Sequence, residues 1–287
     1  MSLPKFKKVN LKEARSFAHF WKKLPVPVHP SQIEIKSWLP KIKEIAKRRN
    51  PQALVLGATP EYRNLLFRFK INITILDINP FMVKAMSYLV KKNIKEKKVL
   101  GDWLKMPFKD NSFDLVMSDS AQDNIQLKDL RKFFKNVYRA LKPDGYWFFG
   151  ASLPGDGVKP LSLENYLSLF RNFPKKFRKA QDRLYYYCRT SIHPRFYNKQ
   201  TRICSWDKLD KVLEKEYKKG IITKKDLIKL QSGSGKFVKS LATTFPWLSV
   251  KELTELLSQY FIIIAQFKDI SHPIFHFHQA FILKPSK

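Results

Sequence analysis

Three short segments in the first third of the chain constrain its fold most. The apolar run Ala53-Leu-Val-Leu breaks at Gly57, a second run, Ile73-Thr-Ile-Leu, ends on Asp77, and Leu100-Gly-Asp102 supplies a third acidic position. In open α/β sheets ligands lie outside the carboxyl ends of parallel strands, where a strand-terminal Asp can accept both hydroxyls of a ribose. The three segments therefore predict the nucleoside-binding edge of such a sheet.

Strands and helices are expected to alternate through the same region. The predicted strands are residues 53–56, 73–76, 99–100, 113–117 and 145–149, and the predicted helices are residues 61–70, 80–92 and 127–141. This spacing implies right-handed parallel crossovers and a doubly wound sheet. Two further strands, residues 260–267 and 274–283, are joined without a helix and must be antiparallel. We therefore predict an α/β fold with a mostly parallel seven-stranded sheet that ends in an antiparallel hairpin.

The remaining segments give the expected domain organisation. Asn10 can cap a first helix, and Ser31 with Glu34 forms a capping box for a second helix that Pro40 should interrupt. We divide the chain into N-terminal helices, a nucleoside-binding core, a mostly helical insertion and a terminal hairpin that completes the sheet. Their bounds are residues 1–50, 51–152, 153–259 and 260–287.

Composition excludes several classes of protein. A chain of 287 residues with 44% hydrophobic content can bury a full core. No apolar run reaches the roughly 18 residues of a membrane span, and Met1-Ser-Leu-Pro-Lys5 lacks the apolar core of a secretory signal. Cys188 and Cys204 form no CxxC pair, so neither a disulfide framework nor a zinc site is indicated. We expect a cytoplasmic protein.

The net charge raises the question of a polyanionic partner. There are 55 Lys and Arg against 24 Asp and Glu, a formal net charge of +31. Such a charge attracts nucleic acid at low salt, although lysines spread along the whole chain also fit a lysine-rich proteome. Residues 171–202 interleave basic and aromatic side chains, including Tyr186, with Asp182 as the sole acid. This segment fits single-stranded RNA, a cap that encloses a small apolar acceptor, or a cap that packs its aromatic residues inward.

Taken together, residues 52–152 and the terminal hairpin resemble class I S-adenosylmethionine-dependent methyltransferases, over somewhat under half of the chain. The resemblance rests on the order and spacing of five motifs. They are Leu54-Val-Leu-Gly57, Asp77, Gly101-Asp102, Phe113-Asp-Leu-Val-Met117 and Leu141-Lys-Pro-Asp-Gly145.

The resemblance implies a role for each motif. Gly57 would let the backbone pass close to the cofactor, Asp77 would accept the ribose hydroxyls, Asp102 would accept the adenine amino group, and Trp103 would flank the ring. The residues expected to bind the cofactor are Gly57, Ala58, Thr59, Glu61, Asp77, Ile78, Asp102, Trp103 and Asp119. The implied cofactor is S-adenosylmethionine, the implied product is S-adenosylhomocysteine, and no metal is expected.

The glycine loop departs from the family pattern. Val55 replaces the usual acid two positions before the first glycine, and Thr59 and Glu61 replace the second and third glycines. Glu61 would stand near the cationic amino-acid end of the cofactor, and the Thr59 hydroxyl could bond its carboxylate. We interpret this as a variant loop. The missing glycines also disfavour a dinucleotide site, which needs them to cradle a pyrophosphate.

The acceptor side of the site is less defined. A sulfonium leaving group is already activated, so positioning the acceptor is the main task, and a base is needed only if the acceptor loses a proton. Candidate catalytic residues are Asp119, after the fourth strand, and His272 in the terminal loop; Gln122, Asp123 and Tyr186 are candidate substrate contacts, while His276 and His278 are interpreted as structural.

The predicted activity is methyl transfer to an undetermined acceptor, with a small molecule favoured. An RNA methyltransferase, or a catalytically silent RNA-binding protein on the same fold, is the alternative. The sequence indicates no oligomeric state.

Overall fold

The computed structural model describes residues 9–22, 29–153, 197–198, 203–205, 209–225, 227–228, 244–246, 248–268 and 278–286. The chain divides into two compact units. The first comprises residues 1–121, 128–152 and 251–287, and the second comprises residues 122–127 and 153–250. Each unit is described by itself below.

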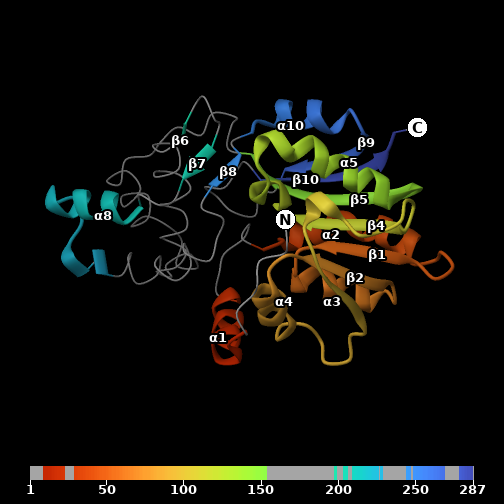
Figure 1. The fold of residues 1–287 in the computed structure, drawn as a ribbon, viewed down its shortest axis with the longest axis horizontal. Helices are drawn as coiled ribbons and strands as arrows, with labels where there is room; N and C mark the ends of the chain where they lie inside the picture. Colours follow the sequence, from red (N-terminus) through yellow and green to blue (C-terminus); the bar gives the residue numbers. More distant parts are fainter. Residues whose placement is uncertain are drawn as a thin grey trace. The chain divides into compact units, whose positions relative to one another are not determined.

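The first unit is built on a seven-stranded sheet in the order β3-β2-β1-β4-β5-β10-β9 (Figure 1). The strands are β1 (Gln52–Leu56), β2 (Asn72–Asp77), β3 (Glu96–Leu100), β4 (Phe113–Asp119), β5 (Leu141–Ser152), β9 (Phe261–Lys268) and β10 (His278–Pro285). The first five run parallel, and β10 is antiparallel to both β5 and β9. The predicted sheet is therefore confirmed, including its antiparallel end. The strand order reverses between β1 and β4, which is where open α/β sheets bind ligands.

Helices supply the apolar side chains that bury this sheet. They are α1 (Leu11–Trp21), α2 (Gln32–Ile45), α3 (Pro60–Arg68), α4 (Pro80–Ser87), α5 (Leu130–Ala140) and α10 (Val250–Leu257), with short 3-10 turns η1 (Trp103–Lys105), η2 (Ala121–Asn124) and η3 (Leu127–Asp129). Adjacent residues of β5 pack on opposite faces of the sheet. Phe148 stacks on Trp38 of α2, whereas Trp147 contacts Phe133 and Phe134 of α5. This alternation is the period of two expected of a strand buried on both faces.

The N-terminal helices differ from the predicted form in one respect. Asn10 and Ser31 cap their helices as predicted, through Lys12 N and Glu34 N respectively. Pro40 does not interrupt α2, which continues to Ile45. Proline removes one backbone hydrogen bond, but burial of the flanking core side chains, such as Trp38, holds the following turn in place.

The described part of the second unit contains α8 (Leu209–Lys218) and a small antiparallel sheet of β6 (Tyr197–Asn198), β7 (Ile203–Ser205) and β8 (Thr244–Pro246). The sequence analysis does not predict these strands. They are two or three residues long, which is too short for a period of two to be recognised. Among the helices that the structure describes, none has the length and apolarity of a membrane span.

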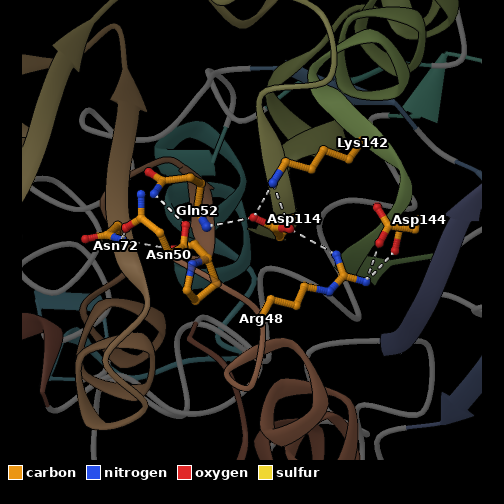
Figure 2. A network of polar contacts seen from close by, with 8 residues as sticks. Arg48, Asn50, Gln52, Asn72, Asp114, Lys142 and Asp144 are labelled. Carbon is orange, nitrogen blue, oxygen red and sulfur yellow. Dashed lines mark hydrogen bonds and ion pairs between the residues drawn. The ribbon is translucent and has the colours of Figure 1, made fainter.

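Asp114, at the start of β4, links the amino ends of three strands (Figure 2). Its carboxylate accepts hydrogen bonds from Gln52 N at 2.9 Å, Arg48 at 3.0 Å and Lys142 at 2.9 Å. Burial by itself raises the pKa of the Asp114 carboxyl, but these three partners outweigh it and hold the pKa below its usual value. The network fixes the edge of the sheet opposite the predicted ligand edge.

We expect Asp114→Asn to lower the free energy of unfolding by roughly 1–3 kcal/mol near neutral pH, because hydrogen bonds between charged groups are lost around a buried position. Since the folded-state pKa is lowered, this stabilisation is present above the unfolded-state pKa and disappears as the pH falls through the folded-state value. Urea denaturation of both proteins at several pH values measures the difference. The control is Asp110→Asn, because the Asp110 side chain is 67% exposed; an equal loss in both variants would contradict the assignment.

Candidate functional site

The carboxyl ends of β1, β2 and β3 bring most of the predicted cofactor residues together. Leu76 O at the end of β2 accepts hydrogen bonds from Gly57 N at 2.9 Å and from Trp103 Nε1 at 2.8 Å. Gly101 N donates to Asp77 O at 3.1 Å. The loops after β1 and β3, which are distant in sequence, are therefore joined at one edge by main-chain acceptors of β2.

The backbone conformation at position 57 requires a glycine. Its φ is +93°, in the region that L side chains rarely adopt. A Cβ at this position would meet only Trp103 Cζ2, at 3.8 Å, which is ordinary contact. The glycine therefore serves the sharp turn from β1 towards α3.

Asp77 is a buried carboxyl at the end of β2. Burial raises its pKa to about 6, although the N–H groups of Asn79 and Ile78 offset part of this effect. Its Oδ1 accepts from Asn79 N at 2.8 Å, which holds the carboxyl at the edge. The next side chain, Ile78, is 42% exposed, so an apolar surface lies beside the acid.

Asp102 and Trp103 lie directly after β3, at the same edge of the sheet. Asp102 Oδ1 accepts from Leu104 N at 2.8 Å and so caps η1. The half-buried Trp103 ring is fixed by its bond to β2, and the main chain of Trp103 is fixed by Asn136, whose Nδ2 donates to Trp103 O at 3.1 Å. A planar apolar surface is thus held rigidly next to an acidic side chain.

The first turn of α3 holds polar atoms without partners. Thr59 occupies the N-cap position, but its side chain makes no capping hydrogen bond. Within the described residues, Glu61 Oε2 and Trp21 Nε1 are both buried without a hydrogen-bond partner. Burial raises the pKa of the Glu61 carboxyl, and its own backbone N–H, the charge of His29 and the Trp21 indole offset part of the rise. The Trp21 indole and the Glu61 carboxyl therefore lie near one another at this end of the site.

Arg63 holds the loop between β1 and α3 in place. The fully buried guanidinium donates to Ala58 O at 3.1 Å and forms a bidentate ion pair with Glu96 at the start of β3. Fork-shaped pairs of this kind fix direction as well as distance. The sequence analysis does not identify Arg63, because a single Arg on a helix gives no sign of its partner 33 positions away.

A second polar cluster lies at the ends of β4 and β5 and the start of β10. Tyr62 donates to Glu34 Oε1 at 2.6 Å, His278 Nε2 is 3.2 Å from Glu34 Oε2, and Ser152 Oγ is 3.4 Å from His278 Nδ1. Burial, followed by the charges of Glu34, Asp119 and Glu61, raises the pKa of Tyr62 well above its usual value, so Tyr62 stays a donor. We refer to Glu34, Asp119, Ser152 and His278 as the histidine cluster.

The sequence analysis misses most of this cluster. It assigns Glu34 to a capping box, yet the Glu34 carboxylate is directed to Tyr62 and His278 instead. Ligand-type atoms of Glu34, Asp119 and His278 lie within 4.8 Å of one another. Because both Glu34 oxygens already have hydrogen-bonding neighbours, we treat the group as a hydrogen-bonded cluster and not as a metal site.

The other predicted acceptor residues have different outcomes. Asp119 is half-buried at the end of β4 and belongs to the histidine cluster. Gln122 and Asp123 belong to the second unit, where both are buried and Gln122 Nε2 donates to Asp123 Oδ1 at 3.2 Å. His272 and Tyr186 lie outside the described residues, as does most of the segment 171–202.

Comparison with known proteins agrees with this fold. Residues 56–149 match the family model of the methyltransferase domain. A solved S-adenosylmethionine-dependent methyltransferase of Methanosarcina mazei is 14% identical with a TM-score of 0.50, over 85% of this chain and 96% of that one, which is a likeness of fold.

Individual relatives extend the comparison. A demethylmenaquinone methyltransferase of Lactobacillus johnsonii is 29% identical over 161 residues, which cover 54% of this chain and 62% of the relative. A sterol 24-C-methyltransferase of Schizosaccharomyces pombe is 34% identical over 77 residues, or 26% of this chain and 20% of the relative. The N-methyltransferase NodS of Bradyrhizobium japonicum, solved with S-adenosylhomocysteine, is 10% identical with a TM-score of 0.50, over 96% of this chain and 99% of that one. The last likeness concerns the fold alone.

The buried Asp77 carboxyl gives a stability prediction. Because burial raises its pKa to about 6, the folded protein favours the protonated form, and this stabilisation is lost as the pH rises through that value. We expect Asp77→Asn to raise the free energy of unfolding by roughly 1–3 kcal/mol at about pH 8 and to leave it unchanged at about pH 4.

Urea denaturation at the two pH values measures this effect without any ligand. Asp102→Asn is the matched control, because asparagine retains the oxygen that caps η1. Destabilisation by Asp77→Asn at the higher pH would show that the carboxylate is favourably solvated in the folded protein.

Proposed function

We propose that this protein binds S-adenosylmethionine at the edge formed by Gly57, Asp77 and Glu61 and transfers its methyl group to a small-molecule acceptor. The observation that supports the proposal most strongly is Glu61 Oε2 at the first turn of α3, a buried oxygen without a hydrogen-bond partner among the described residues. A buried acceptor without a partner costs roughly 1–3 kcal/mol, more when it is charged, so a cationic ligand group is expected there.

The residues at this edge fit the parts of the cofactor. The Asp77 carboxylate would accept the two ribose hydroxyls, while Ile78 and Trp103 offer apolar surfaces for the adenine and Asp102 an acceptor for its amino group. Glu61 would accept from the ammonium group. The Thr59 hydroxyl, which makes no capping hydrogen bond, would donate to the carboxylate of the same ligand.

This assignment explains the variant glycine loop. A loop with several glycines approaches its ligand through backbone N–H groups, whereas this loop keeps only the glycine that the turn requires. Side chains of Thr59 and Glu61 replace the lost backbone contacts. Arg63 keeps the loop in place by binding Ala58 O from beneath.

S-adenosylmethionine, when bound, supplies a methyl group on a positively charged sulfur. The protein's contribution is then to hold the donor and acceptor in line and to exclude water, which can supply roughly 7–11 kcal/mol of the barrier. Rigid supports, such as the bonds of Gly57 and Trp103 to Leu76 O, suit that task.

The small-molecule acceptor is supported by the relatives, which are named for demethylmenaquinone and sterol acceptors. The chain spans less than two thirds of the length of these relatives, so the acceptor is a proposal for this chain. RNA is the second candidate, and the net charge of +31 favours it.

Calorimetry tests cofactor binding. We expect the native protein to bind S-adenosylmethionine and S-adenosylhomocysteine, and Glu61→Gln to weaken both about 10-fold or more, because a charge-assisted hydrogen bond is lost. Binding of 5′-methylthioadenosine, which lacks the amino-acid end, should be the same in both proteins. Glu44→Gln, at an exposed position of α2, is the control; equal losses for all three ligands in Glu61→Gln would remove Glu61 from the proposed role.

A methyl-transfer assay tests the acceptor. The native protein is incubated with methyl-labelled S-adenosylmethionine and either demethylmenaquinol, a sterol, or total RNA over a range of salt concentrations. We expect label in a small-molecule product. Label found in RNA alone, with binding that falls steeply as salt rises, would favour the RNA alternative, because phosphate contacts release counterions.

A further inference from the structure

We propose, as an extension of the proposed methyl transfer, that His278, paired with Glu34, takes up the acceptor's proton through Ser152 and Ser120. The acceptor would then be a hydroxyl group or an activated carbon that loses a proton when it is methylated.

The contacts form a continuous path from the edge of the sheet to its interior. Ser120, the half-buried residue that follows β4, has its Oγ 3.4 Å from Ser152 Oγ. Ser152 Oγ is 3.4 Å from His278 Nδ1, and His278 Nε2 is 3.2 Å from Glu34 Oε2. With the proton of the neutral ring on Nε2, Glu34 accepts it, and Nδ1 is free to accept a proton from Ser152.

A purely structural role of the histidine cluster would not require so many ionisable side chains in one place. A Cβ on Gly150 would lie 3.1 Å from Glu34 Oε1 and 3.2 Å from Asp119 Oδ1 and His278 Nε2, so three ionisable side chains converge over one glycine. An imidazole beside two carboxylates can give or accept a proton through either ring nitrogen. The Asp114 network at the opposite edge, in contrast, places one carboxylate among permanent cations.

The path ends on the side of the sheet where the acceptor is expected. Asp119 and Gly150 are paired at the ends of β4 and β5, and His278 pairs with Ser152 at the start of β10. The charge of Glu34 acts on the Glu61 carboxyl, so the cluster lies within electrostatic range of the proposed ammonium site. The histidine cluster and the cofactor edge thus occupy adjacent strand ends.

The proposed step balances as follows. As the methyl bond forms, the proton on the accepting atom passes to Ser120 Oγ, the Ser120 proton passes to Ser152 Oγ, and the Ser152 proton passes to His278 Nδ1. The electron pair of the broken bond stays with the acceptor. The sulfur keeps the pair of the bond that breaks, and the imidazolium that results is paired with Glu34. Tyr62 holds Glu34 in position.

The first test uses methyl transfer to demethylmenaquinol. We expect Ser152→Ala and His278→Gln each to lower kcat about 100-fold, as loss of a general base does, while the Kd for S-adenosylmethionine changes less than about two-fold. Ser118→Ala is the matched control, because Ser118 is another fully buried serine of the sheet but accepts from Trp147. Unchanged kcat in a folded Ser152→Ala protein would overturn the relay.

The pH profile separates proton transfer from packing. In the native protein kcat should rise with pH as the histidine loses its proton. In Glu34→Gln this rise should move to lower pH, because the imidazolium has lost its carboxylate partner, and in His278→Gln it should disappear. If the pH dependence of kcat is the same in all three proteins, the histidine cluster has a structural role alone.

A second measurement needs neither acceptor nor cofactor. In protein with ¹³C- and ¹⁵N-labelled histidine, the His278 ring signals are assigned by their absence in His278→Gln or, if that variant does not fold, His278→Asn. The nitrogen shifts should show the proton of the neutral ring on Nε2, which faces Glu34, and an unprotonated Nδ1, which faces Ser152. A ring protonated on Nδ1 instead would overturn the proposal even if methyl transfer is observed. Failure to bind S-adenosylmethionine, in contrast, would overturn the proposed function and leave the tautomer to decide whether Nδ1 of His278 can accept a proton.

Discussion

The parallel arrangement of β1 to β5 is the constraint on which the whole site depends. Parallel strands place all their carboxyl ends at one edge, so the loops after β1, β2, β3 and β4 meet there although they are far apart in sequence. Leu76 O shows the result at atomic scale, because it accepts from both Gly57 and Trp103. Every residue proposed to contact the nucleoside lies on this edge.

The two edges of the sheet differ in how their polar groups are satisfied. At the amino ends, Asp114 is surrounded by a backbone donor and two cations, and its pKa is lowered. At the carboxyl ends, burial raises the pKa of Asp77 and of Glu61, and polar atoms of Glu61 and Trp21 have no partner within the described residues. Unsatisfied and shifted groups concentrate where ligands are expected, as they do at functional sites generally.

Much of the fold and part of the site could be predicted from local sequence. Asp77 ends an apolar run just before a helix that starts with Pro80, and both features are visible over eight residues. Gly57 was identified in the same way, because it stops a buried strand. The predicted interruption of α2 at Pro40 was wrong. Helix propensity accounts for the lost hydrogen bond but not for the burial of the neighbouring side chains.

The sequence by itself determined which segments form the strands of the main sheet, that the last two are antiparallel, and that Asp77 ends β2 and Asp102 precedes η1. These features depend on apolar period and turn chemistry within short windows. Only the tertiary structure decided that Glu34 and His278, 244 positions apart, share one buried contact, and that the Trp21 indole lies near Glu61. Such pairs arise because α2 packs on the sheet that contains β10 and α1 packs against α4, and no local pattern encodes which side chains then meet.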